Sequence, residues 1–274
     1  MVQYFCREVK HIFKLISLLS FDSILFLHRG ILVAHEQVFL NKSDLPTFNS
    51  NAIEAHIRFL PGISDCILYL NDDFFIASPT PKSFFVNPIT GGLRLFFDGY
   101  KAPEEEEMKK NGWHRSVGYT NTLINAHYHP NSEKVVRHNY AGHYCYFFRK
   151  DILDKMGNTW RDEFAYTSKN KFRESKDIAV PFMHHNIALE EGLGKRTYAK
   201  NAGGSWKSNH TENVRMWSKF TSKQNHCLCI QDRLDNVPET DAEIEYLEKL
   251  MCSLFPEKSS LELSTDANPC TKYM

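Results

Sequence analysis

The chain has 274 residues, 42% of them apolar, and its 33 basic and 33 acidic side chains leave no formal net charge. A chain without excess positive charge has no electrostatic attraction to a phosphate backbone, so we expect no nucleic-acid partner. Its length and apolar content suffice for one large hydrophobic core and predict a single domain. Seven cysteines without zinc-type CxxC pairs predict neither a metal centre nor a disulfide framework.

Apolar runs and turn residues predict alternating strands and helices along the chain. This βαβ rhythm indicates an α/β fold with a mostly parallel sheet flanked by helices. Residues 79–111, rich in Pro and Gly, are expected to be a variable insert, and residues 263–274 a disordered tail. Cys227 and Cys229, two apart on an apparent strand, are expected to share a face as packing residues. The expected strands are residues 9–13, 31–35 and 66–70, and the expected helices are residues 50–59, 150–160, 178–191 and 240–254.

No segment of the sequence is expected to span a membrane. The most apolar stretch, residues 12–27, is interrupted by Lys14 and Asp22 and falls short of the roughly 20 apolar residues that a spanning helix needs. Two N-glycosylation sequons, at Asn41 and Asn209, permit a secretory location.

An acidic pair, Asp72 and Asp73, follows the expected strand 66–70 and precedes a second apolar run. A buried carboxylate is normally paired or metal-bound because desolvating a lone charge is costly. Ligands of α/β folds gather outside the carboxyl ends of parallel strands, so the pair is placed to hold a Mg²⁺ that bridges nucleotide phosphates. A helix N-cap at Asn71, with both aspartates favouring the helix dipole, is the alternative.

Three ordered blocks of sequence stand out: residues 31–75, which include the acidic pair, residues 113–125 with 140–177, and residues 227–232 with 255–260. In this order they resemble the second, third and fourth conserved regions of the Stealth family of sugar-phosphate transferases. That family includes bacterial capsule polymerases that transfer hexose 1-phosphate and the α/β subunit of the lysosomal-enzyme N-acetylglucosamine-1-phosphotransferase.

The first conserved region of that family, an N-terminal strand that contributes to the nucleotide-sugar site, is not found in the sequence. We therefore expect residues 1–262 to be one Stealth-type catalytic domain of GT-A-like architecture that lacks its N-terminal strand. The resemblance also implies a Golgi or other secretory location if the protein is eukaryotic, and a cytoplasmic location otherwise.

The resemblance implies transfer of a sugar 1-phosphate from a nucleotide diphosphate sugar, with a UDP-sugar as the expected donor, to a hydroxyl of a glycan or glycoprotein. Such a reaction needs a cation clamp on the diphosphate, a base at the acceptor hydroxyl and donors to the phosphate oxygens. Mg²⁺ or Mn²⁺ is the expected cofactor, held by Asp72 and Asp73. The expected catalytic residues are Asp73, the base His143 and the phosphate clamp Arg173, and the expected substrate-binding residues are Asn49, Ser50, Asn51, Asn71, Asp177 and Asp232.

Each assignment has a structural alternative. His143 stands in an aromatic stretch, where a histidine is usually a packed core residue, and His56 or Asp177 would then be the next candidate base. Asp177, one helical turn after Arg173, is expected to orient it, but the two could form a surface salt bridge worth under ~1 kcal/mol. Adjacent His184 and His185 would point about 100° apart on a helix and are expected to be structural.

Two other classes of function stay open. One is an ordinary metal-dependent glycosyltransferase, which passes only the sugar and releases a nucleoside diphosphate. The other is an inactive fragment or a binding subunit, which the missing first region suggests.

Overall fold

The computed structural model describes residues 2–6, 33–109, 111–198, 203–206, 209–221, 226–232, 241–257 and 268–273. The strands are β1 (Val2–Cys6), β2 (Cys66–Leu70), β3 (Phe74–Ile76), β4 (Leu93–Lys101), β5 (Asn139–Ala141), β6 (Tyr146–Arg149), β7 (Gly194–Tyr198), β8 (Gly203–Trp206) and β9 (Cys227–Asp232). The α-helices are α2 (His35–Val38), α3 (Ser50–Ala55), α4 (Glu105–Met108), α5 (Gly112–Tyr128), α6 (Lys150–Thr159), α7 (Arg161–Lys169), α8 (Val180–Glu190), α9 (His210–Phe220) and α10 (Asp241–Leu254). Short 3₁₀ helices are η1 (Lys42–Asp44), η2 (Ile57–Phe59), η3 (Lys82–Phe84) and η4 (Pro269–Tyr273).

The described strands form three small sheets, in the orders β1-β2-β6, β3-β9-β8 and β5-β4-β7. The predicted α/β class is confirmed, but the predicted mostly parallel sheet is wrong. Strand β2 is antiparallel to both of its neighbours, and parallel pairing in the described part occurs between β4 and β7 and between β8 and β9. The run Ile67–Leu70 is buried on both faces, which is typical of parallel strands, although β2 is antiparallel to both of its neighbours.

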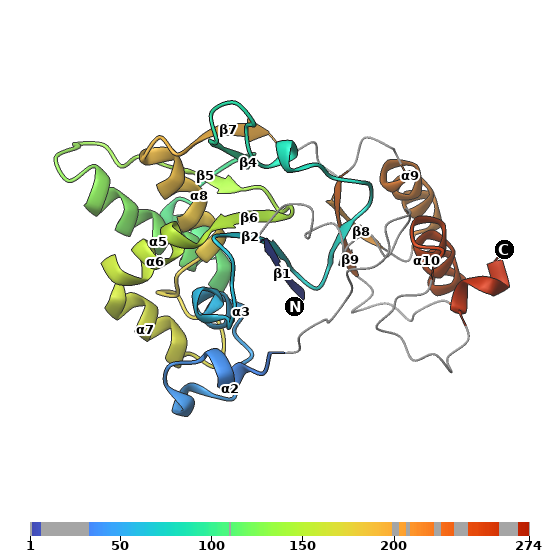
Figure 1. The fold of residues 1–274 in the computed structure, drawn as a ribbon, viewed down its shortest axis with the longest axis horizontal. Coiled ribbons are helices and arrows are strands. Elements are labelled where there is room, and N and C mark those ends of the chain that lie inside the picture. The colour runs from blue at the N-terminus through green and yellow to red at the C-terminus, as the bar shows by residue number, and fades with distance from the viewer. Residues whose placement is uncertain are drawn as a thin grey trace.

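Figure 1 shows helices α5 to α8 at one end of the molecule, strands β2 and β6 near its middle, and β8, β9, α9 and α10 at the other end. Helix α8 is buried on nearly all sides, as an apolar helix in a core should be. The backbone N–H of Arg149 donates to His184 Nε2 at 3.0 Å. Burial lowers the pKa of His184 well below its ordinary value and that of His185 to about 4. Both histidines are neutral packing residues, as predicted.

Most of the expected helices are present. Residues 50–59 form α3 followed by η2, and the helices expected at 150–160, 178–191 and 240–254 are α6, α8 and α10. None of the helices in the described part of the chain combines the length and the apolar character needed to cross a bilayer.

The structure corrects one expected strand and contains another that the sequence analysis did not predict. The strand expected at 31–35 is not formed over residues 33–35, because His35 begins α2, and the strand expected at 9–13 lies outside the described residues. Residues 79–111, expected to be a variable insert, contribute β4, the central strand of its sheet, with Leu93, Leu95 and Phe97 buried. Most of its Pro and Gly residues lie in the turns on either side of that strand, whereas Gly99 lies within it.

Two disulfides correct the expectation from cysteine spacing. Cys145 bonds to Cys227, 82 residues away, and Cys252 bonds to Cys270, 18 residues away. Disulfide connectivity cannot be read from spacing alone, and for that reason the cysteine pattern carried no signal of either bond. Cys227 is therefore a crosslink, whereas Cys229 is a buried free thiol.

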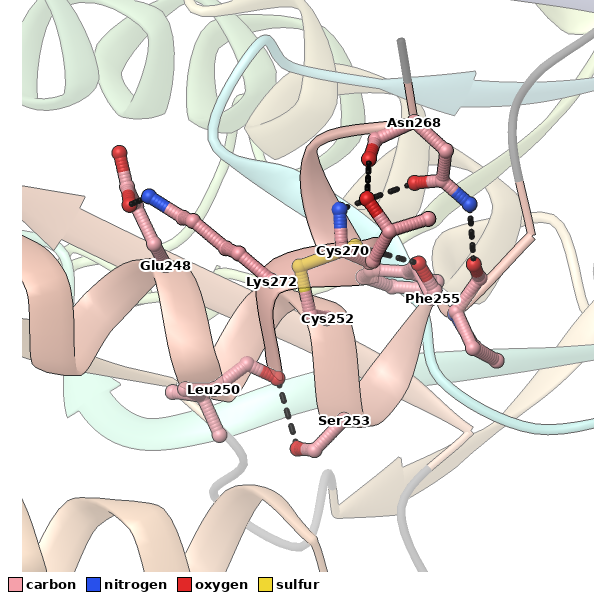
Figure 2. Close-up of a disulfide and its surroundings, with 10 residues drawn as sticks. Glu248, Leu250, Cys252, Ser253, Phe255, Asn268, Cys270 and Lys272 are labelled. Carbon is pink, nitrogen blue, oxygen red and sulfur yellow. Dashed lines mark hydrogen bonds and ion pairs between the residues drawn. A yellow bond between two sulfur atoms is a disulfide. The ribbon is translucent and has the colours of Figure 1, made fainter. Parts of the chain in front are cut away.

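The second disulfide orders part of the expected disordered tail. Figure 2 shows Cys270 of η4 bonded to Cys252 of α10, with a Cα–Cα distance of 5.3 Å. Beside the disulfide, Asn268 Nδ2 donates to the carbonyl of Pro256 at 3.1 Å, and Lys272 pairs with Glu248 at 2.6 Å. Residues 268–273 are thus attached to α10, contrary to the prediction for that part of the tail.

Candidate active site

A cavity of about 1150 Å³ lies between α3, the turn after β2, the N-terminal half of α5 and the N-terminus of α8. Residues far apart in the sequence meet in its wall, because the two strands β2 and β6 pair directly and α3 packs beside them. The predicted site residues that line the cavity are Ser50, Asn51, Asn71, Asp72, Asp73, His143 and Arg173. The structure therefore brings most of the predicted site together.

Asp73 is the centre of a small hydrogen-bond network. Its Oδ2 atom accepts from Cys229 Sγ at 3.2 Å and Gln231 Nε2 at 3.3 Å, and lies 3.4 Å from His143 Nε2. Burial alone would raise the pKa of Asp73, but the bonds from His143, Cys229 and Gln231 outweigh it and lower the pKa below its ordinary value. Asp73 is consequently an ionised acceptor. Burial, together with the adjacent Asp73 carboxylate, raises the pKa of the Cys229 thiol, which stays protonated.

The helix-cap alternative for the acidic pair is excluded because the pair leads into a strand. The backbone N–H of Phe74 donates to the carbonyl of Asn71 at 3.1 Å, which closes a turn, and strand β3 begins at Phe74. Asp72 is exposed and Asp73 is half-buried, so the segment is less buried than its sequence suggested. Both carboxylates face the cavity from a strand-to-strand turn.

His143 is not a packed core histidine. Its side chain is 46% exposed, and its ring packs edge-on against Phe74 with centroids 4.7 Å apart. Besides Asp73, its Nε2 atom lies 3.2 Å from Gln231 Nε2, an amide group that can only donate. Gln231 thus supplies a donor when the imidazole is neutral, and Asp73 supplies an acceptor when it is protonated. The site can stabilise both states of a proton carrier.

Arg173 contacts Ser50 rather than Asp177. Its Nη2 atom donates to Ser50 Oγ at 2.8 Å, and the guanidinium is exposed at the cavity wall. Asp177 is fully buried and accepts from Asn49 Nδ2 at 2.7 Å and from Asn170 Nδ2 at 2.6 Å. The predicted direct pairing of Arg173 with Asp177 is therefore wrong.

Asp177 instead fixes the segment that carries Arg173. It also accepts from the backbone N–H of Glu174 at 2.8 Å, while its partner Asn49 caps the N-terminus of α3 through the N–H of Asn51. Asn49 and Asp177 thus hold the 170–177 loop against α3, which places Ser50 and Arg173 side by side. They are buried positioning residues and not cavity-wall residues. The backbone of Asp232 ends β9, and its side chain lies outside the described residues.

Glu54 is a cavity residue that sequence reasoning missed. It is 8% exposed, and its Oε1 atom accepts from Tyr69 Oη at 3.2 Å. Burial raises the pKa of Glu54 to about 7, although the Tyr69 bond and the charge of Arg173 act in the opposite direction. A carboxyl group that titrates near neutral pH in a cavity is a candidate acid or base. The available signal was its position four residues after Ser50, which puts both on one face of α3.

Cations and aromatic rings complete the cavity wall. Arg115 on α5, which no sequence pattern indicated, lines the cavity, and Trp113, two residues earlier, packs on Tyr140 with ring centroids 5.1 Å apart. At the cavity wall, exposed Phe48 stacks on exposed Phe172 at 5.6 Å. A cavity with arginines, carboxylates and flat apolar surfaces is suited to a charged ligand that also carries rings.

The acidic turn also fits a hard divalent cation. Mg²⁺ and Mn²⁺ prefer oxygen ligands, and Mg²⁺ is usually held by one or two carboxylates together with substrate phosphates. Asp72, Asp73 and the amide of Asn71 offer such oxygens at one end of the cavity. Asp73, His143 and Cys229 also lie close enough to share an ion, but a protonated thiol is a poor ligand.

Comparison with known proteins gives the family of the chain. The family model for Stealth protein conserved region 2 matches residues 24–91, and the model for Stealth protein conserved region 3 matches residues 142–188. The chain belongs to the Stealth family. Region 2 supplies Glu54 and the acidic turn, and region 3 supplies His143 and Arg173, so the cavity lies where the two regions meet. The expected fourth region and the GT-A-like architecture stay predictions.

Several polysaccharide phosphotransferases are similar to this Stealth chain. The capsular polysaccharide phosphotransferase SacB of Neisseria meningitidis serogroup A is 30% identical over 250 residues, which cover 84% of this chain and 42% of SacB. An exopolysaccharide phosphotransferase of Streptomyces coelicolor is 26% identical over 245 residues, covering 85% of this chain and 39% of the relative. The exopolysaccharide phosphotransferase CpsY of Mycobacterium tuberculosis is 30% identical over 164 residues, covering 59% and 30%. The Stealth chain thus spans less than half the length of these relatives.

Proposed function

We propose that this Stealth chain transfers a sugar 1-phosphate from a nucleotide diphosphate sugar to a hydroxyl of a glycan acceptor. The observation that carries the proposal is one cavity in which an ionised aspartate beside a histidine, a neutral-range glutamate and an exposed arginine converge. The names of the relatives, all polysaccharide phosphotransferases, support the same class of reaction.

The reaction is a substitution at the β-phosphorus of the donor. The acceptor oxygen forms a new bond to that phosphorus, the bond between the β-phosphorus and the bridging oxygen breaks, and a nucleoside monophosphate leaves with the electron pair. The phosphate stays between sugar and acceptor. The hydroxyl proton must pass to a base, and the charge on the equatorial oxygens must be stabilised by donors.

His143 is the proposed proton acceptor, and Glu54 is the second candidate. His143 has a donor for its neutral form and an acceptor for its protonated form at one nitrogen, which suits a group that gains and loses a proton in each cycle. Glu54 is half ionised near pH 7 and shares the cavity. The environments of Glu54 and Asp73 shift the pKa values of two carboxyl groups in opposite directions, a pattern typical of acid and base roles in one site.

Arg173 is the proposed clamp on the donor phosphates. A guanidinium binds phosphate oxygens in a bidentate fork, and Ser50 holds that of Arg173 at the cavity wall. Asp72, Asp73 and Asn71 would hold Mg²⁺ or Mn²⁺, which when bound supplies Lewis-acid stabilisation of the diphosphate. Ser50 and Asn51 lie beside Arg173 and are the proposed donor contacts.

The two disulfides support a secretory location. Disulfides persist in oxidising compartments and are rare in the cytosol. The proposal includes a UDP-sugar as the donor and a glycan or glycoprotein as the acceptor. It also places the protein in the Golgi or another secretory compartment. Peptide mapping under non-reducing conditions tests the compartment, because reduced Cys145 and Cys227 in protein from its native source would contradict it.

Product analysis tests the reaction itself. Donor labelled in the β-phosphate is incubated with the protein and a glycan acceptor, and products are separated by mass and charge. Label retained in the acceptor product, with release of nucleoside monophosphate, supports sugar-phosphate transfer. Release of nucleoside diphosphate with an unlabelled product would show an ordinary glycosyltransferase, and donor binding without turnover would show a binding subunit.

A further inference from the structure

A second cluster of ligand-type side chains lies outside the catalytic cavity. His129 follows the C-terminus of α5, His138 precedes β5, and Glu190 is the last residue of α8. Glu190 Oε1 lies 3.0 Å from His138 Nε2 and 3.3 Å from His129 Nε2. One ligand atom from each of the three side chains lies within 4.8 Å of the other two.

The tautomer of His138 is determined by Asn121. The Nδ2 atom of Asn121 donates to the carbonyl of Val136 at 3.1 Å, and its Oδ1 atom accepts from the backbone N–H of His138 at 3.2 Å. These bonds fix the amide orientation, so the 2.8 Å contact between Asn121 Oδ1 and His138 Nδ1 requires a hydrogen on Nδ1. In the neutral ring, Nε2 then carries a lone pair that faces the Glu190 carboxylate.

Two electron-rich atoms 3.0 Å apart need a proton or a cation between them. His138 is 4% exposed, so bulk water does not reach its Nε2 atom as an alternative partner. His129 Nε2 faces the same oxygen, is shielded from solvent and has no hydrogen-bond partner. A single metal ion satisfies all three side chains at once.

The distances and the surroundings match a metal site. Zinc binds histidine nitrogen and carboxylate oxygen at about 2.0–2.2 Å, and tetrahedral coordination then separates neighbouring ligand atoms by about 3.3 Å. The contact between Asn121 and His138 Nδ1 is the outer hydrogen bond that metal-binding histidines usually make. The adjacent Glu191 is engaged elsewhere, by Tyr128 Oη and Lys155, so Glu190 is left to the histidines.

We propose that His129, His138 and Glu190 bind a divalent transition-metal ion, with zinc as the reference ion and water as a fourth ligand. The ion would join His129 and His138, the two ends of the 129–138 segment, to Glu190 at the end of α8. Strand β5 begins directly after His138 and ends at Ala141, which lines the catalytic cavity. The proposed role is therefore structural, holding β5 in place beside the cavity.

Metal binding to the purified full chain tests the proposal. After chelation and dialysis, Co²⁺ is titrated into wild type, His129→Ala, Glu190→Gln and the control His127→Ala, whose exposed imidazole is on the same helix end. Each is also measured in an Asp73→Asn background, which removes one of the two carboxylates proposed to hold a metal ion in the cavity. Visible absorption of four-coordinate Co²⁺ reports the site, and Zn²⁺ competition gives its affinity.

Wild type and His127→Ala should bind one ion that survives Asp73→Asn, and His129→Ala and Glu190→Gln should lose it. Asn121→Ala, which removes the acceptor behind His138 Nδ1 together with the bonds of Asn121 to Val136 and to the backbone of His138, should weaken Zn²⁺ binding by about 10–100-fold. Zn²⁺ should raise the melting temperature of wild type but not of Glu190→Gln, whose amide keeps the shape of the side chain. The proposal is overturned if wild type binds no such ion, or if Glu190→Gln and His129→Ala bind it as tightly as wild type.

Discussion

Asp73 Oδ2 and His143 Nε2 lie 3.4 Å apart, although 70 residues separate them along the chain. Asp73 belongs to the turn after β2 and His143 to the loop that leads from β5 into β6, and the antiparallel pairing of β2 with β6 brings the turn and the loop together. Asp73 therefore meets His143 at the end of a pair of antiparallel strands, β2 and β6, and not at the carboxyl ends of parallel strands.

Asp73→Asn should abolish metal-dependent binding of a nucleotide sugar and leave the fold intact, because the amide preserves the shape of the side chain but removes a charged oxygen ligand. Isothermal titration of the donor with and without Mg²⁺ measures the effect. Asp65→Asn, an exposed aspartate before β2, is the matched control and should bind as wild type does. Metal-dependent binding that persists in Asp73→Asn would refute the metal assignment.

His143→Ala should reduce kcat by about 10²- to 10⁴-fold with little change in donor affinity, because a general base acts in the transition state. The pH profile of active protein should show an ascending limb, because a general base acts only after it has lost its proton. That limb should disappear from the residual activity of the variant. Gln231→Ala, which removes the amide that contacts both His143 Nε2 and Asp73, should have a smaller effect.

The same profile separates the two candidate bases. If Glu54→Gln keeps the ascending limb while His143→Ala loses it, His143 is the base. The reverse result would assign the proton transfer to Glu54, whose pKa of about 7 places its limb near neutral pH. Normal turnover by His143→Ala would return this histidine to a packing role.

Glu54→Gln should stabilise the protein at alkaline pH. The folded-state pKa of Glu54 is raised from 4.5 to about 7, so the folded protein favours its protonated form. Below pH 4.5 Glu54 is protonated in both the folded and the unfolded protein, and its burial does not lower the free energy of unfolding. As the pH rises towards neutrality, ionisation of Glu54 lowers the free energy of unfolding, and above neutral pH the loss is on the order of 3 kcal/mol. Urea unfolding at about pH 5 and about pH 8 should show this loss in wild type and in exposed Glu105→Gln, but not in Glu54→Gln.

Asp177→Asn should destabilise the protein and weaken donor binding together. The buried carboxylate accepts from Asn49, Asn170 and the backbone of Glu174, and an amide cannot accept all three bonds without leaving a donor unpaired. A loss of about 1–3 kcal/mol is expected from the free energy of unfolding. Because Arg173 loses its support, KM for the donor should rise more than kcat falls. Arg173→Lys, with the loop intact, should raise KM without destabilising the fold.

Cys270→Ser should release η4 from α10 without affecting the catalytic cavity. Closing a loop of 18 residues contributes about 3 kcal/mol to stability in the chain-entropy model. Limited proteolysis should then cut residues near η4 more quickly, and donor binding should be unchanged. Equal protease resistance in the variant and in wild type would show that the segment is held by its other contacts.

Local patterns predicted the helices better than they predicted the sheets. Residues 150–160 and 178–191 carry apolar side chains at helical spacing and form α6 and α8. The direction of β2 could not be predicted, because Ile67–Leu70 is apolar on both faces in either pairing. Strand β4 was missed because its flanking turns, rich in Pro and Gly, dominate the composition of residues 79–111.

The proposed catalytic residues were identified mainly through the family resemblance, and their contacts were not predicted. Asp73, His143 and Arg173 were placed correctly in one cavity, but Asp177 contacts Asn49 and not Arg173. Glu54 was missed because a glutamate on a short helix is usually solvated, and only its burial in the folded protein raises its pKa. Such long-range contacts leave no periodic trace in a sequence.

The Cys145–Cys227 disulfide has a consequence for how the catalytic contact is maintained. Cys145 lies in the loop of His143, and Cys227 lies on β9, the strand that carries Gln231. Closing an 82-residue loop costs about 4.5 kcal/mol of chain entropy. Because the disulfide keeps this loop closed in the unfolded chain as well, folding no longer has to overcome that cost. The imidazole and the amide therefore remain at high effective concentration even when β9 separates briefly from β3, and re-forming their contact is a local event.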